Sequence, residues 1–251
     1  MIEHEQLMYK VLGKISETNA PIIFKGALIA KLILAENGFS KLDRITRDID
    51  ANWVDTPPSM CVLVETVNQS LETFKGALRA EAMRVYTEKK SAGISIIDTV
   101  TGDRIISMDI TIKPVTGSRV YHYGEASIRG VLVNEILADK ITALSGIKMF
   151  RRSKDLIDVY ALTQCVKVLT TEIFEVINSK QLELGDFSEL LTRRDDVEHA
   201  YKKLQGIKGK PSFDNIYLYM TKFVLPFAQK DKTPKIWNDE KQAWDNTSLP
   251  L

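Results

Sequence analysis

The amino-acid sequence predicts an α/β (α+β) protein in which a mixed-sheet domain precedes an all-α domain. Strand-like alternation of apolar and polar residues is concentrated before residue 130, whereas helical periodicity dominates after it. No internal repeat or low-complexity tract interrupts the 251 residues. We therefore expect an α/β domain over residues 1–130, a helical domain over 131–229 and an extended C-terminal tail over 230–251.

The N-terminal segment predicts a helix and then a strand–glycine–helix unit. Apolar residues recur at helical spacing from Glu3 to Thr18, which favours an amphipathic helix. The apolar residues 22–24 favour a short buried strand, and residues 27–37 have a helical composition. Gly26 lies between this strand and this helix, where a tight turn is needed.

Strand patterns dominate the next stretch of the chain. Residues 48–53 alternate apolar and polar side chains, as do residues 104–113, so both segments predict strands with one apolar face. Two prolines before Ser59 favour the start of a helix. The other elements expected here are the helix itself over 59–74, strands over 80–88 and 93–98, and a hairpin turn at 101–103.

Helices fill the second half of the chain, after a short strand or lead-in at residues 131–133. Apolar residues recur every three or four positions, and Thr170 offers a capping hydroxyl. The polar tail is expected to dock through Trp237 and Trp244. The predicted helices span 134–146, 154–165, 170–179, 194–205 and 212–228.

Composition excludes several classes of protein. Lys and Arg number 34 against 33 Asp and Glu, so the net charge of +1 excludes a broadly basic nucleic-acid coat but allows a local basic patch. Cys61 and Cys165 cannot form a disulfide framework, and both are expected to be reduced core thiols. Neither a secretory signal nor an apolar run of about 20 residues is visible, so we expect a cytoplasmic protein.

Three aspartates are candidate metal ligands. Asp48 and Asp50 flank Ile49, and the period of two places both carboxylates on one face of the predicted strand. Asp109 lies on the polar face of the predicted strand 104–113. Carboxylate oxygens suit Mg²⁺, so a two-metal site is predicted if these strands are neighbours. The alternative is a set of solvated aspartates at strand ends.

A candidate phosphate-binding turn lies upstream of these aspartates. Gly26 follows a strand and opens a helix, where backbone N–H groups and the positive end of the helix favour an anion. Lys25 immediately precedes it. A plain tight turn is the alternative interpretation.

Four motifs occur in the order typical of one enzyme family. Phe24-Lys25-Gly26-Ala27-Leu28 resembles its Leu-Lys-Gly-Gly-Thr-Ala-Leu, and residues 44–50 (RITRDID) resemble its Arg-Phe-Ser-x-Asp-Ile-Asp. Residues 135–144 (EILADKITAL) resemble its Glu-x-x-Ala-x-Lys-x-x-Ala-Leu, and residues 154–160 (KDLIDVY) resemble its Arg-Asp-x-x-Asp-x-Tyr. From about residue 22 to residue 162, the chain resembles the AbiEii/AbiGii toxin family of nucleotidyltransferases, a branch of the polymerase-β-like superfamily.

The resemblance implies roles for the motif residues. Asp48 and Asp50 would bind Mg²⁺, and Asp109 would be the third ligand or the general base. Lys140 would contact the triphosphate or a transition-state oxygen, with Asp155 acting in the same cleft. The residues that the resemblance assigns to nucleotide binding are Lys25, Gly26, Arg44, Thr46, Lys140 and Asp158.

The chain departs from the family pattern in two places. Ala27 and Leu28 stand where the family has a second Gly and a Thr or Ser, so a hydroxyl expected to contact phosphate is missing. Lys154 replaces an Arg, which removes a bidentate donor. Both changes lower the expected affinity for a nucleotide.

A basic cluster adjoins the last motif. Phe150 lies within it and could stack on a base or belong to the core. The cluster could hold an RNA phosphate backbone, with a solvated surface as the alternative. Its members are Lys148, Arg151, Arg152 and Lys154.

The leading hypothesis is a Mg²⁺-dependent nucleotidyltransferase that moves NMP from an NTP to an acceptor hydroxyl. The acceptor would be RNA, such as tRNA, or a protein. The resemblance further implies an abortive-infection toxin with a cognate antitoxin as partner. Two alternatives stay open: a catalytically weakened module of the same fold that binds RNA or protein, and a nucleotidyltransferase acting on a small molecule such as an antibiotic.

Overall fold

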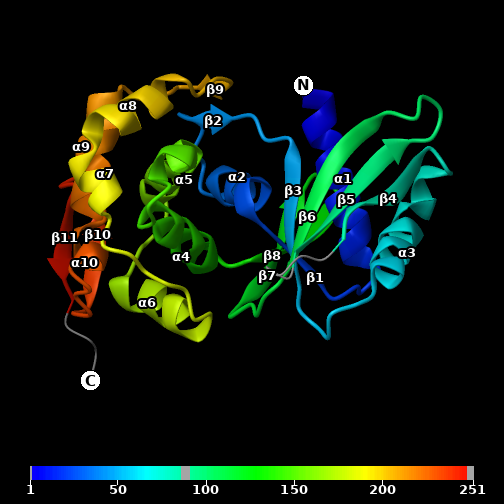
Figure 1. Ribbon diagram of the computed structural model, residues 1–251, viewed down its shortest axis with the longest axis horizontal. Helices are drawn as coiled ribbons and strands as arrows, with labels where there is room; N and C mark the ends of the chain where they lie inside the picture. The colour runs from blue at the N-terminus through cyan, green and yellow to red at the C-terminus, as the bar shows by residue number, and fades with distance from the viewer. Residues whose placement is uncertain (1, 86–90, 248–251) are drawn as a thin grey trace. The chain divides into compact units, whose positions relative to one another are not determined.

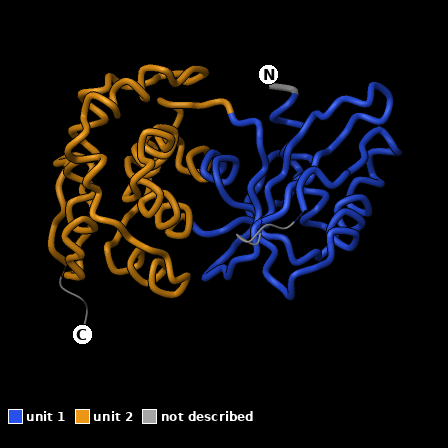
Figure 2. The backbone as a smooth tube through the Cα atoms, in the orientation of Figure 1, with its two compact units in different colours: residues 1–32, 46–132 blue, residues 33–45, 133–251 orange. Residues whose placement is uncertain are grey.

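The computed structural model describes residues 2–85 and 91–247 of the chain. The chain divides into two compact units (Figure 2). Unit 1 comprises Met1–Leu32 and Thr46–Leu132, and unit 2 comprises Ile33–Ile45 and Val133–Leu251. Residues 33–45 therefore belong with the second half of the chain, although they were expected in the N-terminal domain. These residues belong to unit 2 because β2 (Asp43–Arg44) pairs with β9 (Ile207–Lys208). Local sequence patterns do not predict such a long-range contact.

Within the described residues, unit 1 is built on a seven-stranded mixed sheet in the order β4-β5-β6-β3-β1-β8-β7 (Figure 1). The pairs β3–β6 and β1–β8 are parallel, whereas the other neighbours are antiparallel. The strands are β1 Ile22–Lys25, β3 Asp48–Trp53, β4 Leu78–Arg84, β5 Ser91–Asp98, β6 Arg104–Ile112, β7 Ser118–Tyr123 and β8 Ala126–Val131. The mixed sheet predicted for this part of the chain is thus present.

Helices α1 (Ile2–Glu17) and α3 (Met60–Leu71) pack against each other and against this sheet. The apolar face of the sheet is buried, with Ile49, Ile94 and Met108 each fully inaccessible to solvent. Ser59 caps α3, because its hydroxyl accepts a hydrogen bond from the backbone N–H of Val62. A short 3₁₀ turn, η1 (Glu72–Phe74), completes the helix expected over 59–74.

The hairpin of β7 and β8 was not predicted from the sequence, which suggested only a short strand at 131–133. Along β7 only Tyr121 is buried. The strand therefore needs no regular alternation of apolar and polar residues, which is the pattern that predicts a strand. The strand expected over 80–88 runs over 78–84, and its last predicted residues lie outside the described part of the chain.

Unit 2 is predominantly helical, and each predicted helix has a counterpart, although η2 and the short α7 were not predicted and the helix expected over 212–228 is divided into α9 and α10. The all-α domain expected over 131–229 is not confirmed, because β9 lies within these residues and pairs with β2. In the tail, β10 (Lys235–Asn238) pairs with β11 (Ala243–Asn246). Helix α2 (Gly26–Glu36) begins in unit 1 and ends in unit 2. The other helices are α4 Val133–Leu144, η2 Met149–Arg152, α5 Ser153–Thr163, α6 Thr170–Ser179, α7 Ser188–Thr192, α8 Arg194–Lys202, α9 Phe213–Phe223 and α10 Leu225–Ala228.

The expected extended tail over 230–251 contains this β10–β11 hairpin and docks on unit 2. Trp237 and Trp244 are partners across the hairpin, with ring centroids 5.3 Å apart. The indole N–H of Trp237 donates to the hydroxyl of Tyr219 (2.8 Å), and that of Trp244 donates to the carbonyl of Phe223 (2.9 Å). Both indoles thus pair their polar atom while packing apolar surface, which explains the docking of a polar segment.

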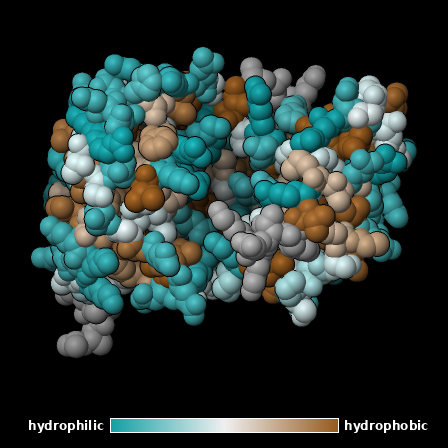
Figure 3. Space-filling model, viewed as in Figure 1, coloured by the Kyte–Doolittle hydropathy of each residue, from teal (hydrophilic) through white to brown (hydrophobic). Residues whose placement is uncertain are grey.

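The surface differs from expectation at the cysteines. Cys61 is exposed and Cys165 is half-buried, so neither is a core thiol. Burial and the nearby Asp239 raise the pKa of the Cys165 thiol to about 11. Figure 3 shows a mostly hydrophilic face on which apolar residues are scattered. Among the described residues, no helix combines the length and the apolar character needed to cross a membrane.

Candidate functional site

Two of the three predicted metal ligands are direct neighbours in the sheet of unit 1. Strands β3 and β6 run parallel, and their register sets Asp50 opposite Asp109 and Asp48 opposite Ser107. Neighbouring strands lie about 4.8 Å apart, and residues paired across them point to the same face. The carboxylates of Asp50 and Asp109 therefore share one face, and Asp48 shares it because it precedes Asp50 by two residues.

This face carries small polar side chains over three neighbouring strands. Strand β5 extends each cross-strand row, since its residues pair with the same positions of β6. We call the nine positions the polar sheet face. Its rows are Asn52–Thr111–Ser91, Asp50–Asp109–Gly93 and Asp48–Ser107–Ser95. The intervening residues, such as Ile49 and Met108, point into the core and hold the aspartates on the opposite side.

Gly26 lies against the Asp50 carboxylate. Its φ of +72° belongs to the left-handed region, and a Cβ there would overlap the Oδ2 atom of Asp50. Gly26 is also the first residue of α2, directly after β1. The glycine predicted to approach a phosphate thus makes room for the neighbouring carboxylate at the start of this helix.

Lys25 is the partner of Asp50 across β1 and β3, and its ammonium is anchored in the adjacent row. Its ammonium donates to Asn52 Oδ1 (2.6 Å) and to Thr111 Oγ1 (2.7 Å). The hydroxyl of Thr111 also contacts Asn52 Oδ1 at 2.7 Å. These bonds set the orientation of the Asn52 amide, because the opposite orientation would bring its NH₂ group against the Lys25 ammonium. Sequence reasoning missed Asn52 and Thr111, whose positions depend on strand register.

The Asn52 amide ends in a buried donor. Asn52 is fully buried, and its Nδ2 atom has no hydrogen-bond partner among the described residues. A buried donor without a partner is costly unless a water or ligand oxygen satisfies it. It marks the row next to Asp50 as a place suited to an additional oxygen atom.

Arg84 is a second residue that sequence reasoning missed. Its Nη2 atom donates to Asp109 Oδ1 at 2.7 Å, and both side chains are about half exposed. The contact crosses Gly93, which pairs with Arg84 on one side and with Asp109 on the other. A Cβ on Gly93 would lie 2.8 Å from Met83 Cε and 3.3 Å from Arg84 Cβ. The absence of a side chain at Gly93 therefore leaves space for the Arg84 side chain to reach Asp109. A lone Gly within a strand pattern is the signal that could have indicated this approach.

The donor set suits Mg²⁺ in chemistry, although a three-carboxylate group is not assembled. Among residues 2–85 and 91–247, no group of three or more His, Cys, Asp or Glu side chains converges as metal ligands. Asp109 is engaged by Arg84, and Asp48 is exposed at the start of β3. Two adjacent carboxylates still match the usual protein share of a Mg²⁺ site, in which waters and substrate phosphates complete the shell. Asp50 and Asp109 are therefore the residues that could hold this ion.

The remaining motif residues gather in unit 2 as one ion cluster, while Thr46 is buried in unit 1. The Lys140 ammonium donates to Asp155 Oδ1 (2.8 Å) and Asp158 Oδ2 (2.6 Å). Arg44 binds the same Asp158 in bidentate fashion, through Nε (2.6 Å) and Nη2 (2.7 Å). We call Arg44, Lys140, Asp155 and Asp158 the ion cluster of unit 2.

Two members of this ion cluster, Lys140 and Asp158, are held in their charged forms. Burial opposes the charged form of Lys140, but the ion pairs with Asp158 and Asp155 outweigh it and raise its pKa above the ordinary value. Burial likewise opposes the charged form of Asp158, yet Lys140 and Arg44 lower the pKa of this carboxyl. The two cations and two carboxylates balance, so Lys140 is a fixed cation and cannot serve as a general base.

A second buried ion group explains other residues of the helical motif. Lys180, at the end of α6, donates to Glu135 Oε2 (3.0 Å) and to Asp139 Oδ1 (2.9 Å). The side chains of Lys180 and Glu135 are each only 1% exposed. Glu135 thus joins α4 to α6, a structural role that the motif alone does not reveal.

The predicted RNA-binding cluster lies on the surface of unit 2. Phe150 is 41% exposed, while its neighbour Met149 is buried and anchors η2. The cationic members of the cluster, Lys148, Arg151, Arg152 and Lys154, are all exposed. Their role in RNA binding stays a prediction.

Two kinds of comparison with known proteins give a match to this chain. A family model described as "Nucleotidyl transferase AbiEii toxin, Type IV TA system" matches residues 11–217. Among solved structures, the chain is similar to MenT4, a nucleotidyltransferase toxin from Mycobacterium tuberculosis, with 13% identity and a TM-score of 0.48. That match covers 80% of this chain and 84% of the other. A comparison with curated proteins finds no match.

Proposed function

This chain belongs to the AbiEii family of nucleotidyltransferase toxins, and from that premise we propose that it moves NMP from an NTP to an acceptor hydroxyl with the help of Mg²⁺. The observation that carries the proposal is the register of β3 and β6. It sets Asp50 beside Asp109 on the same face as Asp48. The chemistry of nucleotidyl transfer needs such carboxylates, because the triphosphate is itself anionic and must be held through cations.

The reaction is an in-line displacement at the α-phosphorus. The acceptor oxygen forms a bond to this phosphorus, the bond to the bridging α,β-oxygen breaks, and pyrophosphate leaves. When bound, Mg²⁺ supplies charge neutralisation and lowers the pKa of the attacking hydroxyl. Asp50 and Asp109 would hold the metal, with Asp48 on the same face, or Asp109 would instead accept the hydroxyl proton.

Other side chains near Asp50 position the substrate. Lys25 holds a positive charge one row away, and the buried Nδ2 donor of Asn52 is suited to a phosphate oxygen. Arg84 neutralises Asp109 and is exposed enough to move to a substrate phosphate. The predicted role of Gly26 in nucleotide binding belongs to the same proposal, as does that of Thr46.

The nucleotide contacts of unit 2 are a further part of the proposal. Lys140 would contact the triphosphate, with Arg44 and Asp158 beside it. In their present arrangement these residues bind one another, so a phosphate must replace a carboxylate partner. Asp155, which lies at the outer side of the cluster, is the partner most easily displaced, because it is more exposed than Asp158.

The family description, which names a toxin–antitoxin system, supports a proposal for the partner. We propose RNA such as tRNA, or a protein side chain, as acceptor, and a cognate antitoxin as partner. The cytoplasmic location stays a prediction.

A second candidate function is a catalytically weakened module of the same fold that binds RNA or protein. Ala27 and Leu28 at the start of α2 favour it, since neither side chain offers a hydroxyl to a phosphate. The pairing of Asp109 with Arg84 also favours it, because a metal must compete with a protein cation.

A transfer assay tests the proposal. The protein is incubated with Mg²⁺, each α-labelled NTP in turn and total tRNA, with Asp50→Asn as test variant. Asp103→Asn is the matched control, because this exposed aspartate lies in the turn before β6, outside the polar sheet face. We expect label on RNA or protein with the wild type and the control, and none with Asp50→Asn or with EDTA. Label that persists in Asp50→Asn contradicts the proposal. Absence of label with the folded wild-type protein favours the binding module.

A further inference from the structure

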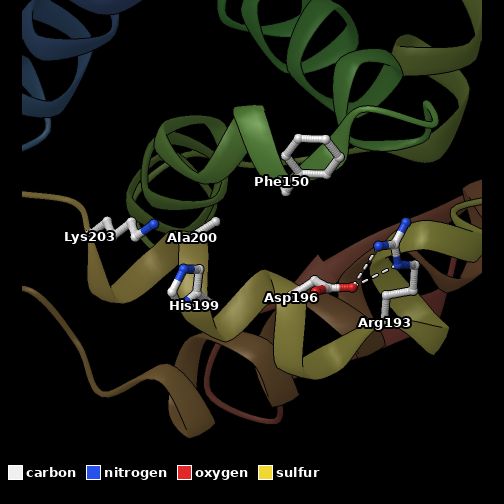
Figure 4. Close-up of a pocket in the computed structure, with 6 residues that line it drawn as sticks. All are labelled: Phe150, Arg193, Asp196, His199, Ala200 and Lys203. Carbon is white, nitrogen blue, oxygen red and sulfur yellow. Dashed lines mark hydrogen bonds and ion pairs between the residues drawn. The ribbon is translucent and has the colours of Figure 1, made fainter.

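Unit 2 contains a pocket, lined in part by Phe150, that the proposed transfer reaction does not use (Figure 4). It has a volume of about 480 Å³, within the range of small-molecule sites. One wall is Phe150 of η2, and the other is a face of α8 and its flanking residues. The lining residues are Phe150, Arg193, Asp196, His199, Ala200 and Lys203.

The lining combines an aromatic ring with groups that bind polar edges. Ala200 leaves space opposite Phe150, so a flat ring can enter between η2 and α8. Asp196 offers a carboxylate to amino groups, and Arg193 compensates its charge through Nε (2.8 Å) and Nη2 (2.7 Å). His199 adds a ring that donates or accepts a hydrogen bond.

Four cationic side chains, of which one lines this pocket and three are near Phe150 in the sequence, have no ion pair among the described residues. Lys203 forms no ion pair with any described carboxylate, and the same holds for Lys148, Arg151 and Lys154 in the part of the chain that the structure describes. Arg152 lies 3.9 Å from Asp155 Oδ2, at the limit of an ion pair. The cationic residues flank Phe150 in the sequence, so the pocket opens beside a strip of unneutralised charge.

We propose that the pocket holds one unstacked base of a single-stranded nucleic acid. Phe150 stacks on the base, and Lys148, Arg151 and Lys203 bind the flanking phosphates. Interleaved aromatic and cationic side chains are the usual means of holding single strands, because every base has a stacking face and every linkage a negative charge. An acidic peptide fits less well, since the Asp196 carboxylate would repel it inside the pocket. That the strand is the acceptor RNA rests on the proposed function, whereas binding itself requires neither NTP nor metal.

Fluorescence anisotropy with a labelled RNA strand of about 12 nucleotides tests the inference, in EDTA and without NTP. Phe150→Ala is expected to weaken binding about tenfold, the usual effect of losing one stacked base. Phe150→Trp is expected to retain the affinity for RNA, because an aromatic ring is kept. This result would show that Phe150→Ala loses affinity through the missing ring and not through misfolding. Leu218→Ala is the control, because Leu218 of α9 is a similarly exposed apolar residue of unit 2 outside the pocket.

Charge and base contributions are separated by salt. The Arg151→Ala variant is expected to lower the slope of log affinity against log salt by about 0.7, as for one lost phosphate contact on a single strand. Phe150→Ala is expected to leave this slope unchanged. Equal RNA affinities of Phe150→Ala and Leu218→Ala would overturn the inference, as would polyglutamate that binds as tightly as RNA in a Phe150-dependent manner.

Further experimental outcomes distinguish this inference from the proposed function. A DNA strand of the same sequence that binds equally supports the base pocket but removes the argument for an RNA acceptor at this site. Phe150-dependent binding in a protein that transfers no label supports the pocket and contradicts the transferase. Transfer that survives in Phe150→Ala with unchanged RNA affinity contradicts the pocket alone.

Discussion

The Arg84 guanidinium binds the Asp109 carboxylate across Gly93, with 2.7 Å between Nη2 and Oδ1. A protein cation therefore occupies one of the carboxylates proposed to hold Mg²⁺. The pair is about half exposed, so solvent weakens it and exchange for a metal ion is inexpensive.

Replacing Arg84 should increase metal affinity. In Arg84→Gln the metal no longer competes with the guanidinium, and the gain should be about twofold to fivefold, as expected for an exposed ion pair. Titration calorimetry with Mg²⁺ or Mn²⁺ measures it. Arg79→Gln is the control, since Arg79 of the same strand pairs with Glu81 in a similarly exposed position. A lower metal affinity in Arg84→Gln than in Arg79→Gln would contradict the prediction.

Replacing Gly26 should separate backbone strain from damage to the site. Gly26→Ala and Gly38→Ala both place a side chain at positive φ, which costs about 1–2 kcal/mol of unfolding free energy. A Cβ at Gly38 meets nothing within 4 Å, whereas one at Gly26 overlaps the Asp50 carboxylate. We expect both variants to lose stability in urea unfolding and only Gly26→Ala to lose metal binding and transfer. Equal metal affinities in the two variants would show that the contact with Asp50 is unimportant.

The ion cluster of unit 2 should make stability depend on acid pH. The pKa of Asp158 is lowered on folding, so its contribution is present above the ordinary value of 3.8 and is lost as pH falls through the folded value. In Asp158→Asn, Arg44 loses its bidentate partner, and the unfolding free energy at neutral pH should fall by about 3–5 kcal/mol. This difference from wild type should shrink below about pH 5.

Urea unfolding at several pH values measures this difference. Asp214→Asn is the control, because its pair with Arg194 lies at the surface and should contribute little at any pH. A wild-type advantage over Asp158→Asn that stays constant into the acid range would be inconsistent with the linkage. The raised pKa of Lys140 has the opposite sign: its contribution is complete below the ordinary value of 10.5 and is lost only as the solution becomes more alkaline.

The buried group of Lys180 should behave as a unit. Lys180→Met removes the ammonium that binds both Glu135 and Asp139, and losing this buried ion pair should cost about 3–5 kcal/mol of unfolding free energy. The double variant Lys180→Met/Glu135→Leu removes both buried charges and should recover most of this loss. Asp139 needs no replacement because its side chain is 32% exposed. A double variant as unstable as the single one would indicate that packing, not the lost ion pair, causes the loss.

Local periodicity was sufficient to predict much of the sheet and its aspartates. The alternation around Ile49 placed Asp48 and Asp50 on one face, and β3 begins and ends where this pattern does. Asp109 was named as the third carboxylate, but local periodicity could not show that it lies beside Asp50, because this depends on the pairing of β3 with β6, whose paired residues are 59 positions apart in the sequence. Arg84 was missed for the same reason, because its partner is set by two successive antiparallel registers.

In the helical half, too, local sequence patterns did not predict the long-range contacts. Helical spacing indicated that Asp155 and Asp158 share a face, and the structure has both bind Lys140. The contact between Arg44 and Asp158 spans 114 residues and assigns the segment 33–45 to unit 2. No local pattern contains that information. The β7–β8 hairpin was missed because a strand with one buried residue lacks the alternation on which strand prediction depends.

The positions of the three tryptophans provide a natural spectroscopic label for each unit. Trp53 ends β3, the strand that carries Asp48 and Asp50, whereas Trp237 and Trp244 lie together in the hairpin of unit 2. Replacing Trp53 by Phe leaves emission from unit 2 alone, and replacing the other two leaves emission from unit 1 alone. Fluorescence can therefore follow the denaturation of each unit separately, and a metal that binds beside β3 should perturb the signal of Trp53.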